Sequence, residues 1–403
     1  MIKARLKYII KTQKGKVPKT FSDDSSYPPY LSMDYLRGDT DRILYVKPKD
    51  EYKLVDENEV LVLWDGANAG EVMFSKKGYI SSTMAIVTPK SEFFEKRFLF
   101  YFLKSIEGEL KKASTGTTIP HLDQNFLFNT HFEFPEVEVQ KPIADYLDEQ
   151  SAKITRFIQT KQRFIELLKE QRQSIITNAV TKGIDDGIKM KETVLGNIPE
   201  HWEVRRLGTI GRFSKGGNIS RSELIYTDDG VPAILYGDLY TKYDIVAENI
   251  INRITKGTAA KSVELKKDDL LFTGSGETKE DIGKCVIYNS NVPAYAGGDV
   301  IIFKQDVFDS YFISYSQNSS IAKYQKAISS KGEIIVHTYG SKLRDVIMPY
   351  PPTLKEQQEI IKHIKTESRT LDIAISKAER EIELIKEYRE AMIAEAVTGK
   401  MKL

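Results

Sequence analysis

A long stretch of this 403-residue sequence occurs twice. The segment IELLKEQRQSIITNAVTKG, residues 165–183, returns as IELIKEYREAMIAEAVTGK, residues 382–400. From residue 135 to residue 183, every position aligns without a gap with the position 217 residues later. Polar identities are retained along with apolar ones, as in Glu166 with Glu383 and Arg172 with Arg389. Two unrelated amphipathic helices would share only the apolar pattern, so the repeat indicates an internal duplication.

Each copy of the repeat is predicted to be one long helix. Its apolar residues recur in steps of three, four and seven, which keeps them on one stripe of a helix, as a coiled-coil seam requires. A helix of about 40 residues is ~60 Å long, which suits a spacer rather than an ordinary globular helix. The predicted seam consists of Ile143, Leu147, Ile154, Ile158, Ile165, Leu168 and Ile175 in the first copy and of Ile360, Ile364, Leu371, Ile375, Ile382, Ile385 and Met392 in the second.

Both predicted helices have recognisable ends. Thr353 and Glu356 predict a capping box, in which each side chain binds a backbone N–H group at the start of the second helix. Pro142 is compatible with the first turn of the first helix, where its missing N–H would have no partner in any case. Gly183 and Gly399 stand where C-cap glycines are expected.

The segments before the two helices resemble each other more loosely. Each contains β-branched runs between glycine-rich turns, then an amphipathic helix at residues 93–110 or 310–327, then a polar loop with one histidine, His121 or His337. Such runs predict strands, so each half is expected to be an α+β domain followed by its long helix. The expected segments are domain 1–135, helix 136–183, linker and leader 184–203, domain 204–350 and helix 351–403.

This order of elements suggests how the halves are arranged. If the second helix packs against the first through the matched seams, it runs back antiparallel as a coiled coil. The two α+β domains are then expected at opposite ends of the helices, related by an approximate two-fold axis. Duplex DNA has a local two-fold relation between its strands, so such a molecule can read two half-sites separated by an unread spacer. A surface that binds one partner would be duplicated as well.

The composition of the chain excludes several further classes of function. The net charge is +2, so a polyanion must meet local basic patches rather than a basic tail. The single cysteine, Cys285, excludes a disulfide framework and fits a reducing cytoplasm. No segment approaches the ~20 apolar residues of a membrane span, and the N-terminus does not resemble a signal peptide. No nucleotide-binding glycine–lysine loop is present, and scattered single histidines predict no metal site.

Three features together carry a resemblance to a known family. They are the duplicated helix, the leader LGNIPEHWEV at residues 195–204 and the loop GTTIPH at residues 116–121. With these features the chain resembles the DNA-specificity (S) subunits of type I restriction–modification systems over nearly its whole length. The resemblance implies two target-recognition domains, residues 1–135 and 204–350, two conserved helical regions and no catalysis by this chain.

The resemblance also implies partners. These are double-stranded DNA, two methyltransferase (M) subunits that bind S-adenosylmethionine, and ATP-driven restriction (R) subunits. S-adenosylmethionine, ATP and Mg are therefore expected on the partner subunits, no cofactor is expected on this chain, and the complex is expected in the cytoplasm. One departure from the family pattern is that no counterpart of residues 195–203 precedes the first domain. Either the start is shortened or this copy lacks the leader.

Two other functions are alternatives to this one. The first is a stand-alone adenine-N6 DNA methyltransferase, suggested by YPPY at residues 27–30 and FTGSG at residues 272–276. Tyr27 lacks the amide or carboxylate that would accept hydrogen bonds from the adenine amino group, and the aligned segment LWDGA, residues 63–67, has no glycine pattern. The second is a coiled-coil scaffold that does not bind DNA, which would leave both α+β domains without a role.

Candidate DNA contacts follow from side-chain chemistry. Phosphates are contacted by Lys, Arg and loop N–H groups, whereas bases are read by bidentate Arg, Asn or Gln. Trp64 is expected either to stack on a displaced base or, more simply, to belong to the core. The candidate DNA-binding residues are Lys14, Lys16, Lys19, Asn68, Thr117 and Thr118 in the first domain and Lys215, Asn218, Arg221, Ser275, Lys279 and Lys331 in the second.

Overall fold

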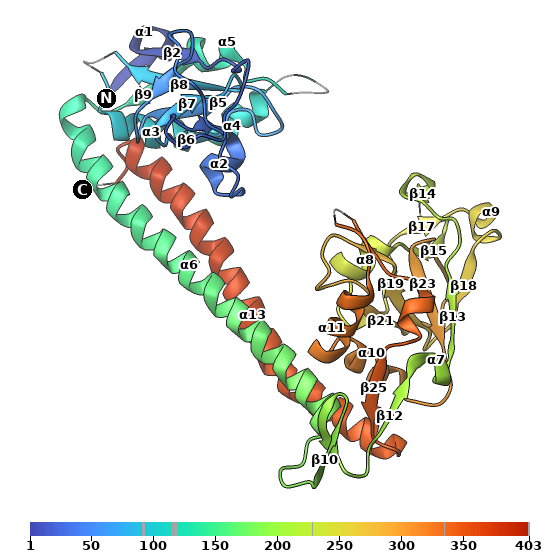
Figure 1. Cartoon of the computed structure of the whole chain (residues 1–403). Helices are drawn as coiled ribbons and strands as arrows, with labels where there is room; N and C mark the ends of the chain where they lie inside the picture. Colours follow the sequence, from blue (N-terminus) through green and yellow to red (C-terminus); the bar gives the residue numbers. More distant parts are fainter. Residues whose placement is uncertain (91–92, 115, 117–119, 228, 334, 402–403) are drawn as a thin grey trace. The chain divides into compact units, whose positions relative to one another are not determined.

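The computed structural model describes residues 1–90, 93–114, 116, 120–227, 229–333 and 335–401. The chain forms two compact units, Met1–Gln162 with Glu379–Leu403, and Arg163–Ala378 (Figure 1). Each unit contains one α+β domain together with parts of two long helices, α6 and α13. These units group each domain with the helix ends that pack against it, whereas the segments expected from the sequence follow chain order and stay a prediction.

The first unit is built around a four-stranded antiparallel sheet with the strand order β2–β8–β5–β6. Its strand β5 reads VLVL, and all four residues are buried. Helix α3 packs across β5, β6 and β8 and buries Phe98, Leu99 and Phe102. These elements are β2 (Ile10–Lys14), β5 (Val60–Leu63), β6 (Val72–Phe74), β8 (Met84–Pro89) and α3 (Lys96–Ser105).

Smaller elements complete the first unit. Strand β1 pairs antiparallel with β9, which leads directly into α6, and β3–β7–β4 form a three-stranded sheet. The remaining elements are β1 (Ile2–Arg5), α1 (Leu6–Ile9), β3 (Tyr30–Leu31), α2 (Met33–Arg37), β4 (Leu54–Val55), β7 (Gly78–Ile80), α4 (Glu107–Ala113), α5 (Gln124–Asn129) and β9 (His131–Phe134).

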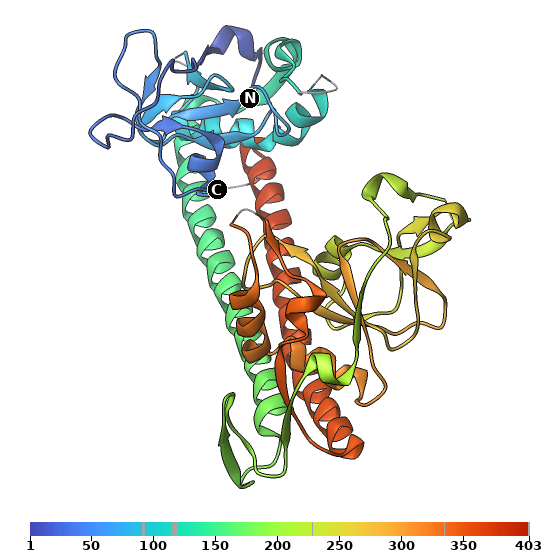
Figure 2. The same ribbon diagram turned by 45° about the vertical axis from the view of Figure 1, so that its right-hand side comes forward.

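The second unit contains two five-stranded sheets, β13–β23–β19–β21–β16 and β14–β17–β15–β22–β18. Its strands are β12 (Glu203–Arg206), β13 (Arg212–Lys215), β14 (Leu224–Ile225), β15 (Val231–Ile234), β16 (Val246–Ala247), β17 (Arg253–Ile254), β18 (Val263–Leu265), β19 (Leu270–Thr273), β20 (Ser275–Gly276), β21 (Cys285–Tyr288), β22 (Ala294–Ala296), β23 (Val300–Lys304), β24 (Val336–His337) and β25 (Ile347–Tyr350). A leader hairpin, β10 (Met190–Thr193) with β11 (Gly196–Pro199), stands apart from these sheets beside the C-terminal end of α6 (Figure 2).

Short helices connect the strands of the second unit. They are α7 (Leu207–Ile210), the 3-10 helix η1 (Arg221–Glu223), α8 (Tyr236–Thr241), α9 (Lys256–Ala259), α10 (Ser310–Gln317), α11 (Ser320–Ser329) and α12 (Gly340–Leu343). Helix α10 packs against β21 through a buried face that includes Phe312 and Ile313.

The two α+β domains share one topology. The order β2–β8–β5–β6 of the first domain recurs as β13–β23–β19–β21 in the second. The pair β1–β9 before α6 corresponds to the pair β12–β25 before α13. The predicted duplication of the segments before the long helices is therefore confirmed at the level of strand order.

The single amphipathic helix predicted in each domain is wrong, because each is divided in two. In the second domain the division falls at Asn318, whose side chain exchanges hydrogen bonds with the backbone N–H and C=O of Cys285. Ser319 then caps α11 by accepting a hydrogen bond from the N–H of Ala322. In the first domain α3 ends at Ser105, and Glu107 begins α4 while accepting a hydrogen bond from the N–H of Val72. In both domains, hydrogen bonds between the helical segment and a strand thus mark the place where the predicted helix is interrupted.

The long helices agree with the predicted lengths and C-caps. Helix α6 (Val137–Lys182) has 46 residues and α13 (Leu354–Val397) has 44. Gly183 has φ +77° and Gly399 has φ +70°, the left-handed conformation expected of glycine after a helix.

Two details at the helix starts differ from the prediction. Pro142 lies in the second turn of α6, since the helix already begins at Val137. The capping box is half formed: Thr353 Oγ1 accepts from the Glu356 N–H at 3.3 Å. The Glu356 carboxylate instead accepts a hydrogen bond from the Trp202 indole at 2.8 Å. Trp202 is fully buried, so the leader anchors the start of α13.

The predicted seam residues are buried or partly buried within each unit. In the first unit Ile143, Leu147 and Ile154 of α6 share a hydrophobic core with Met392 of α13, and Lys161 pairs with Glu381 at 2.5 Å. Figures 1 and 2 both show these two helix ends side by side. In the second unit the core contains Ile176, Ala179 and Val180 of α6 with Ile360, Ile361 and Ile364 of α13.

One seam position needs correction. Ile175 is only half-buried, whereas the next residue, Ile176, is 2% exposed and belongs to the core. Seven residues of an α-helix complete slightly less than two full turns, so the buried stripe moves over by one residue toward the helix end. Ile158 and Ile385 are partly buried at the margin of the first unit's core. Among the described residues, no helix is long and apolar enough to span a membrane.

Candidate nucleic-acid interface

The two domains contain an equivalent strand–loop crossing. In the first domain Asp65 forms an antiparallel bridge with His121. In the second, Ser275 of β20 pairs with His337 of β24. The carbonyl just before Asp65 or Ser275 accepts a hydrogen bond from the N–H just after the histidine, at 2.8 Å in the first domain and 2.9 Å in the second. Asp65 and Ser275 are therefore equivalent, as are the two histidines.

This equivalence corrects the sequence alignment of residues 63–67 with residues 272–276, which is wrong by one position. The strands before these loops, VLVL and LLFT, are buried along their whole length. In such continuous apolar runs, no alternation of apolar and polar residues indicates which positions of the two strands are equivalent. In the sheets, Val62 lies opposite Ala85 and Phe272 lies opposite Ile301, and this register sets the true alignment.

Lysines from the neighbouring strand stand at equivalent positions too. Lys14 ends β2 opposite Ala85, and Lys215 ends β13 opposite Ile301. Each is followed by a glycine at which no other residue fits. A Cβ atom on Gly15 would lie 2.1 Å from the Ile80 carbonyl oxygen, and one on Gly216 would lie 2.0 Å from the Gly297 carbonyl oxygen. Close backbone contact thus accounts for the glycine that follows each lysine.

In the first domain these groups form a cluster of Lys14, Asp65 and His121. Lys14 Nζ donates to Asp65 Oδ2 at 2.7 Å, and His121 Nδ1 lies 2.7 Å from Asp65 Oδ1. Burial raises the pKa of the Asp65 carboxyl, but hydrogen bonds from Lys14 and His121 outweigh this effect and hold that pKa below its usual value. The carboxylate is 22% exposed and is therefore still accessible from solvent.

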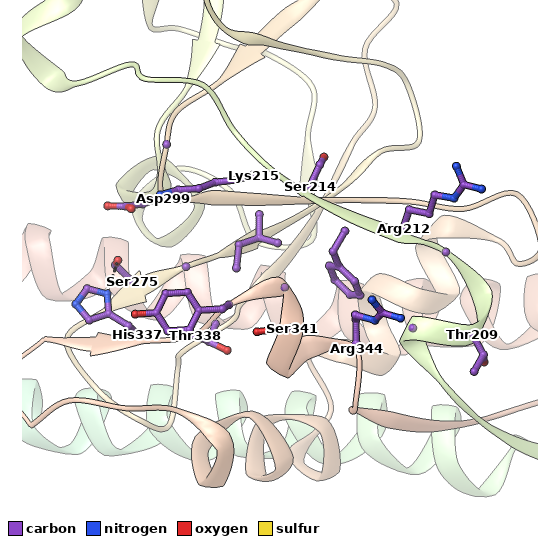
Figure 3. A pocket seen from close by; sticks show the side chains of 18 residues that line it. Thr209, Arg212, Ser214, Lys215, Ser275, Asp299, His337, Thr338, Ser341 and Arg344 are labelled. Carbon is purple, nitrogen blue, oxygen red and sulfur yellow. Dashed lines mark hydrogen bonds between the residues drawn. The ribbon is translucent and has the colours of Figure 1, made fainter.

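In the second domain the equivalent groups line a cavity of about 850 Å³. Ser275 Oγ lies 3.0 Å from His337 Nδ1 at one end, and Arg212 and Arg344 lie at the other (Figure 3). Lys215 also lines the cavity.

The charge of this cavity is mainly positive. Three cations, Arg212, Lys215 and Arg344, face one acid, Asp299, among the lining residues. Of the described acidic groups, none forms an ion pair with these three side chains, in contrast to Lys14. A concave surface with unneutralised Lys and Arg side chains attracts phosphate groups. The cavity therefore has the charge and shape that suit phosphate groups.

The structure brings only some of the predicted contact residues together. Lys215 and Ser275 line the same cavity, while Lys14 is held by Asp65. Ser275 is 5% exposed, so it offers its hydroxyl only inside the cavity. Thr117 and Thr118 lie outside the described residues. The other predicted residues are exposed side chains: Lys16, Lys19, Asn68, Asn218, Arg221, Lys279 and Lys331.

Four residues of these sites are absent from the predicted DNA contacts: Asp65, His121, Arg212 and Arg344. The sequence does show the matched histidines, each five residues after a glycine, Gly116 or Gly332, but the pattern alone does not assign them to a contact. The arginines and Asp65 come from separate segments with no shared motif.

Other sequence alternatives lose their support in the structure. Trp64 is 4% exposed and packs near Phe128, so it belongs to the core and base stacking by it is excluded. Phe272 is fully buried in β19 and Ser275 begins β20, so the FTGSG segment runs through two strands and is not a cofactor-binding loop. No group of three or more metal-ligating side chains occurs in the part of the chain that the structure describes.

Comparisons with known proteins match this chain to a family over most of its length. The family model for the type I restriction modification DNA specificity domain matches residues 3–167 and 199–384. The type I restriction enzyme MjaVIII specificity subunit of Methanocaldococcus jannaschii is 29% identical over 416 residues, covering 99% of this chain and 92% of that protein. The MjaIX specificity subunit of the same organism is 23% identical over 321 residues, covering 76% and 69%.

The fold has a match among solved structures. A chain from a study of complex assembly and conformational transition of the type I R-M system superposes with a TM-score of 0.67. The match covers 99% of this chain and 98% of that one, at 14% sequence identity. At this identity the match establishes similarity of fold.

Proposed function

Because the chain belongs to the type I restriction–modification DNA-specificity family, we propose that each of its α+β domains reads one half of a bipartite DNA site. The chain is a specificity subunit, not the catalytic subunit of its complex. The observation that carries the proposal is the duplicated crossing, which gives both domains a lysine and a histidine at equivalent positions.

The two half-sites should differ in sequence. Position 65 is a carboxylate held by Lys14 and His121, whereas the equivalent Ser275 is a neutral hydroxyl in a cavity that is also lined by unneutralised cations. Acceptor-only and donor–acceptor groups select different base edges in the major groove. The recognised sequence is accordingly asymmetric. Residues 1–135 and 204–350 are the proposed target-recognition domains.

Helices α6 and α13, within residues 136–183 and 351–403, are proposed to form an antiparallel coiled coil that sets the spacing between the half-sites. Within the first unit, early residues of α6 share a core with late residues of α13. Within the second unit the relation is reversed, since late residues of α6 share a core with early residues of α13. Arg172 also pairs with Asp372 at 2.9 Å. Antiparallel packing accounts for both relations.

The helices are also proposed to dock two methyltransferase subunits. Leu167 and Leu384 are equivalent in the repeat, and each is 46% exposed. Large apolar side chains exposed at matched positions suit two copies of one partner. S-adenosylmethionine would be bound by those subunits, and ATP and Mg by restriction subunits that join the same complex. A DNA-directed complex of this kind works beside the chromosome, in the cytoplasm.

Phosphate contacts by the cavity predict a change in salt dependence. Each lost contact should reduce the slope of log binding constant against log salt by about 0.9. Lys215→Ala and Arg344→Ala are each expected to cause this reduction, measured as binding of specific DNA by the assembled complex across salt concentrations. Lys189→Ala is the control, because Lys189 is exposed next to the leader hairpin, outside the cavity. Unchanged slopes in both cavity variants would contradict the assignment.

The proposed division of labour predicts where methylation activity resides. Three samples would be incubated with labelled S-adenosylmethionine and DNA: this chain alone, its methyltransferase partner alone, and both together. Sequence-specific methyl transfer is expected only with both, because this chain supplies the site and the partner supplies the chemistry. Methyl transfer by this chain alone would support the alternative that it is a stand-alone methyltransferase. Sequence-specific transfer by the partner alone would contradict the proposal that this chain determines specificity.

A further inference from the structure

The two domains differ at one position of their shared crossing. The first domain carries a carboxylate, Asp65, where the second carries a hydroxyl, Ser275. The lysine and histidine around this position are the same in both domains. Because the other two members of the cluster match, this position is where the two domains can differ in the DNA sequence that they recognise.

The fold does not require the carboxylate. Backbone bonds already hold the loop of the first domain, since Gly66 N donates to the Pro120 oxygen at 2.9 Å and Leu122 N donates to the Trp64 oxygen at 2.8 Å. The second domain holds its loop by the equivalent pairing of β20 with β24, with no carboxylate at that position. Closing the loop on the sheet therefore does not require a carboxylate at position 65.

A negative charge on a DNA-binding surface is unfavourable beside phosphates. It is favourable where it accepts a hydrogen bond from a base amino group. An ionised carboxylate only accepts and has about four lone-pair sites. The Lys14 and His121 side chains occupy one site on each oxygen of Asp65, at 2.7 Å in both cases. The remaining sites are available on a group that its neighbours hold charged and fixed in place.

We propose that Asp65 accepts a hydrogen bond from the exocyclic amino group of one base in the first half-site, cytosine N4 or adenine N6, and thereby determines specificity there. Lys14 and His121 position the carboxylate. This inference rests on the proposed function, because it requires the first domain to read DNA. The second domain, with Ser275, has no acceptor-only group at the equivalent position and sets no such requirement.

The test removes amino groups from the DNA one at a time. The wild-type complex of this chain with its methyltransferase partner would be bound to duplexes in which one cytosine carries 2-pyrimidinone, or one adenine carries purine. At one position of the first half-site, loss of the amino group should weaken binding at least about tenfold, as expected for one base contact. The base at that position identifies the amino group as cytosine N4 or adenine N6.

The same duplexes would then be bound by an Asp65→Ser complex, in which the first domain matches the second at this position. The tenfold difference should disappear, while contacts of the second half-site stay unchanged. Asp50→Ser, at an exposed carboxylate of the same domain, is the matched control and should retain the difference. The inference is overturned if no amino group of the first half-site matters to the wild-type complex, or if Asp65→Ser retains the full difference. A wild-type complex with no sequence-specific binding would instead overturn the proposed function.

Discussion

Replacing Leu168 by aspartate is expected to abolish the stable assembly of this chain with its methyltransferase partners. Leu168 is 8% exposed, although its neighbours Leu167 and Lys169 on the same turn are exposed. An unpaired carboxylate at an apolar buried position costs several kcal/mol. That is a large part of the ~5–15 kcal/mol that stabilises a typical domain. Urea unfolding of the chain and size-exclusion chromatography of co-expressed subunits would measure the loss.

The neighbouring position supplies the control. Lys169→Asp introduces the same side chain one residue away on the exposed side of α6, so it should change the unfolding midpoint only slightly. If Leu168→Asp unfolds at the wild-type urea concentration and co-elutes with its partners, the buried stripe of α6 does not stabilise the assembly.

The long helices could be predicted from the sequence because helical order is local. The apolar period, the retained polar identities and the glycines at residues 183 and 399 all lie within the helices or at their ends, and the C-caps agree with the structure. The shift of burial from Ile175 to Ile176 could not be predicted, because it depends on how far the real helix departs from a strict seven-residue repeat.

The breaks in the shorter helices depend on contacts distant in sequence. Asn318 ends α10 by bonding to the backbone of Cys285, a strand residue more than 30 positions earlier. No helix-stop signal of the glycine or proline kind marks this place, so the amphipathic pattern alone predicted one continuous helix.

The site was predicted least completely, for a related reason. Asp65 meets Lys14 and His121 only after three separate segments are brought to one edge of the sheet. In the sequence each histidine appears alone, and the fully buried strands VLVL and LLFT leave the alignment of the two loops uncertain by one residue. Residue type alone was enough to select exposed lysines as candidate DNA contacts, but it could not show which side chains lie beside them.

Exchange of the first domain has the largest expected effect on recognition. Residues 1–134 would be replaced by the matching domain of a family relative that recognises a different sequence. The new domain brings its own residues at the positions of Lys14, Asp65 and His121, while the second domain keeps its cavity. Both long helices would remain, with α6 and α13 unchanged. One half-site should therefore change completely, and the other half-site and the spacer should stay as they were.

Mapping methylated bases across the genome of a host that carries this chain and its methyltransferase partner tests that outcome directly. The wild-type chain should give one asymmetric bipartite sequence, and the exchanged chain should give a sequence with one half replaced and the other half identical. If both halves change together, or if neither does, the two domains do not read their half-sites independently and the account of two separate readers is wrong.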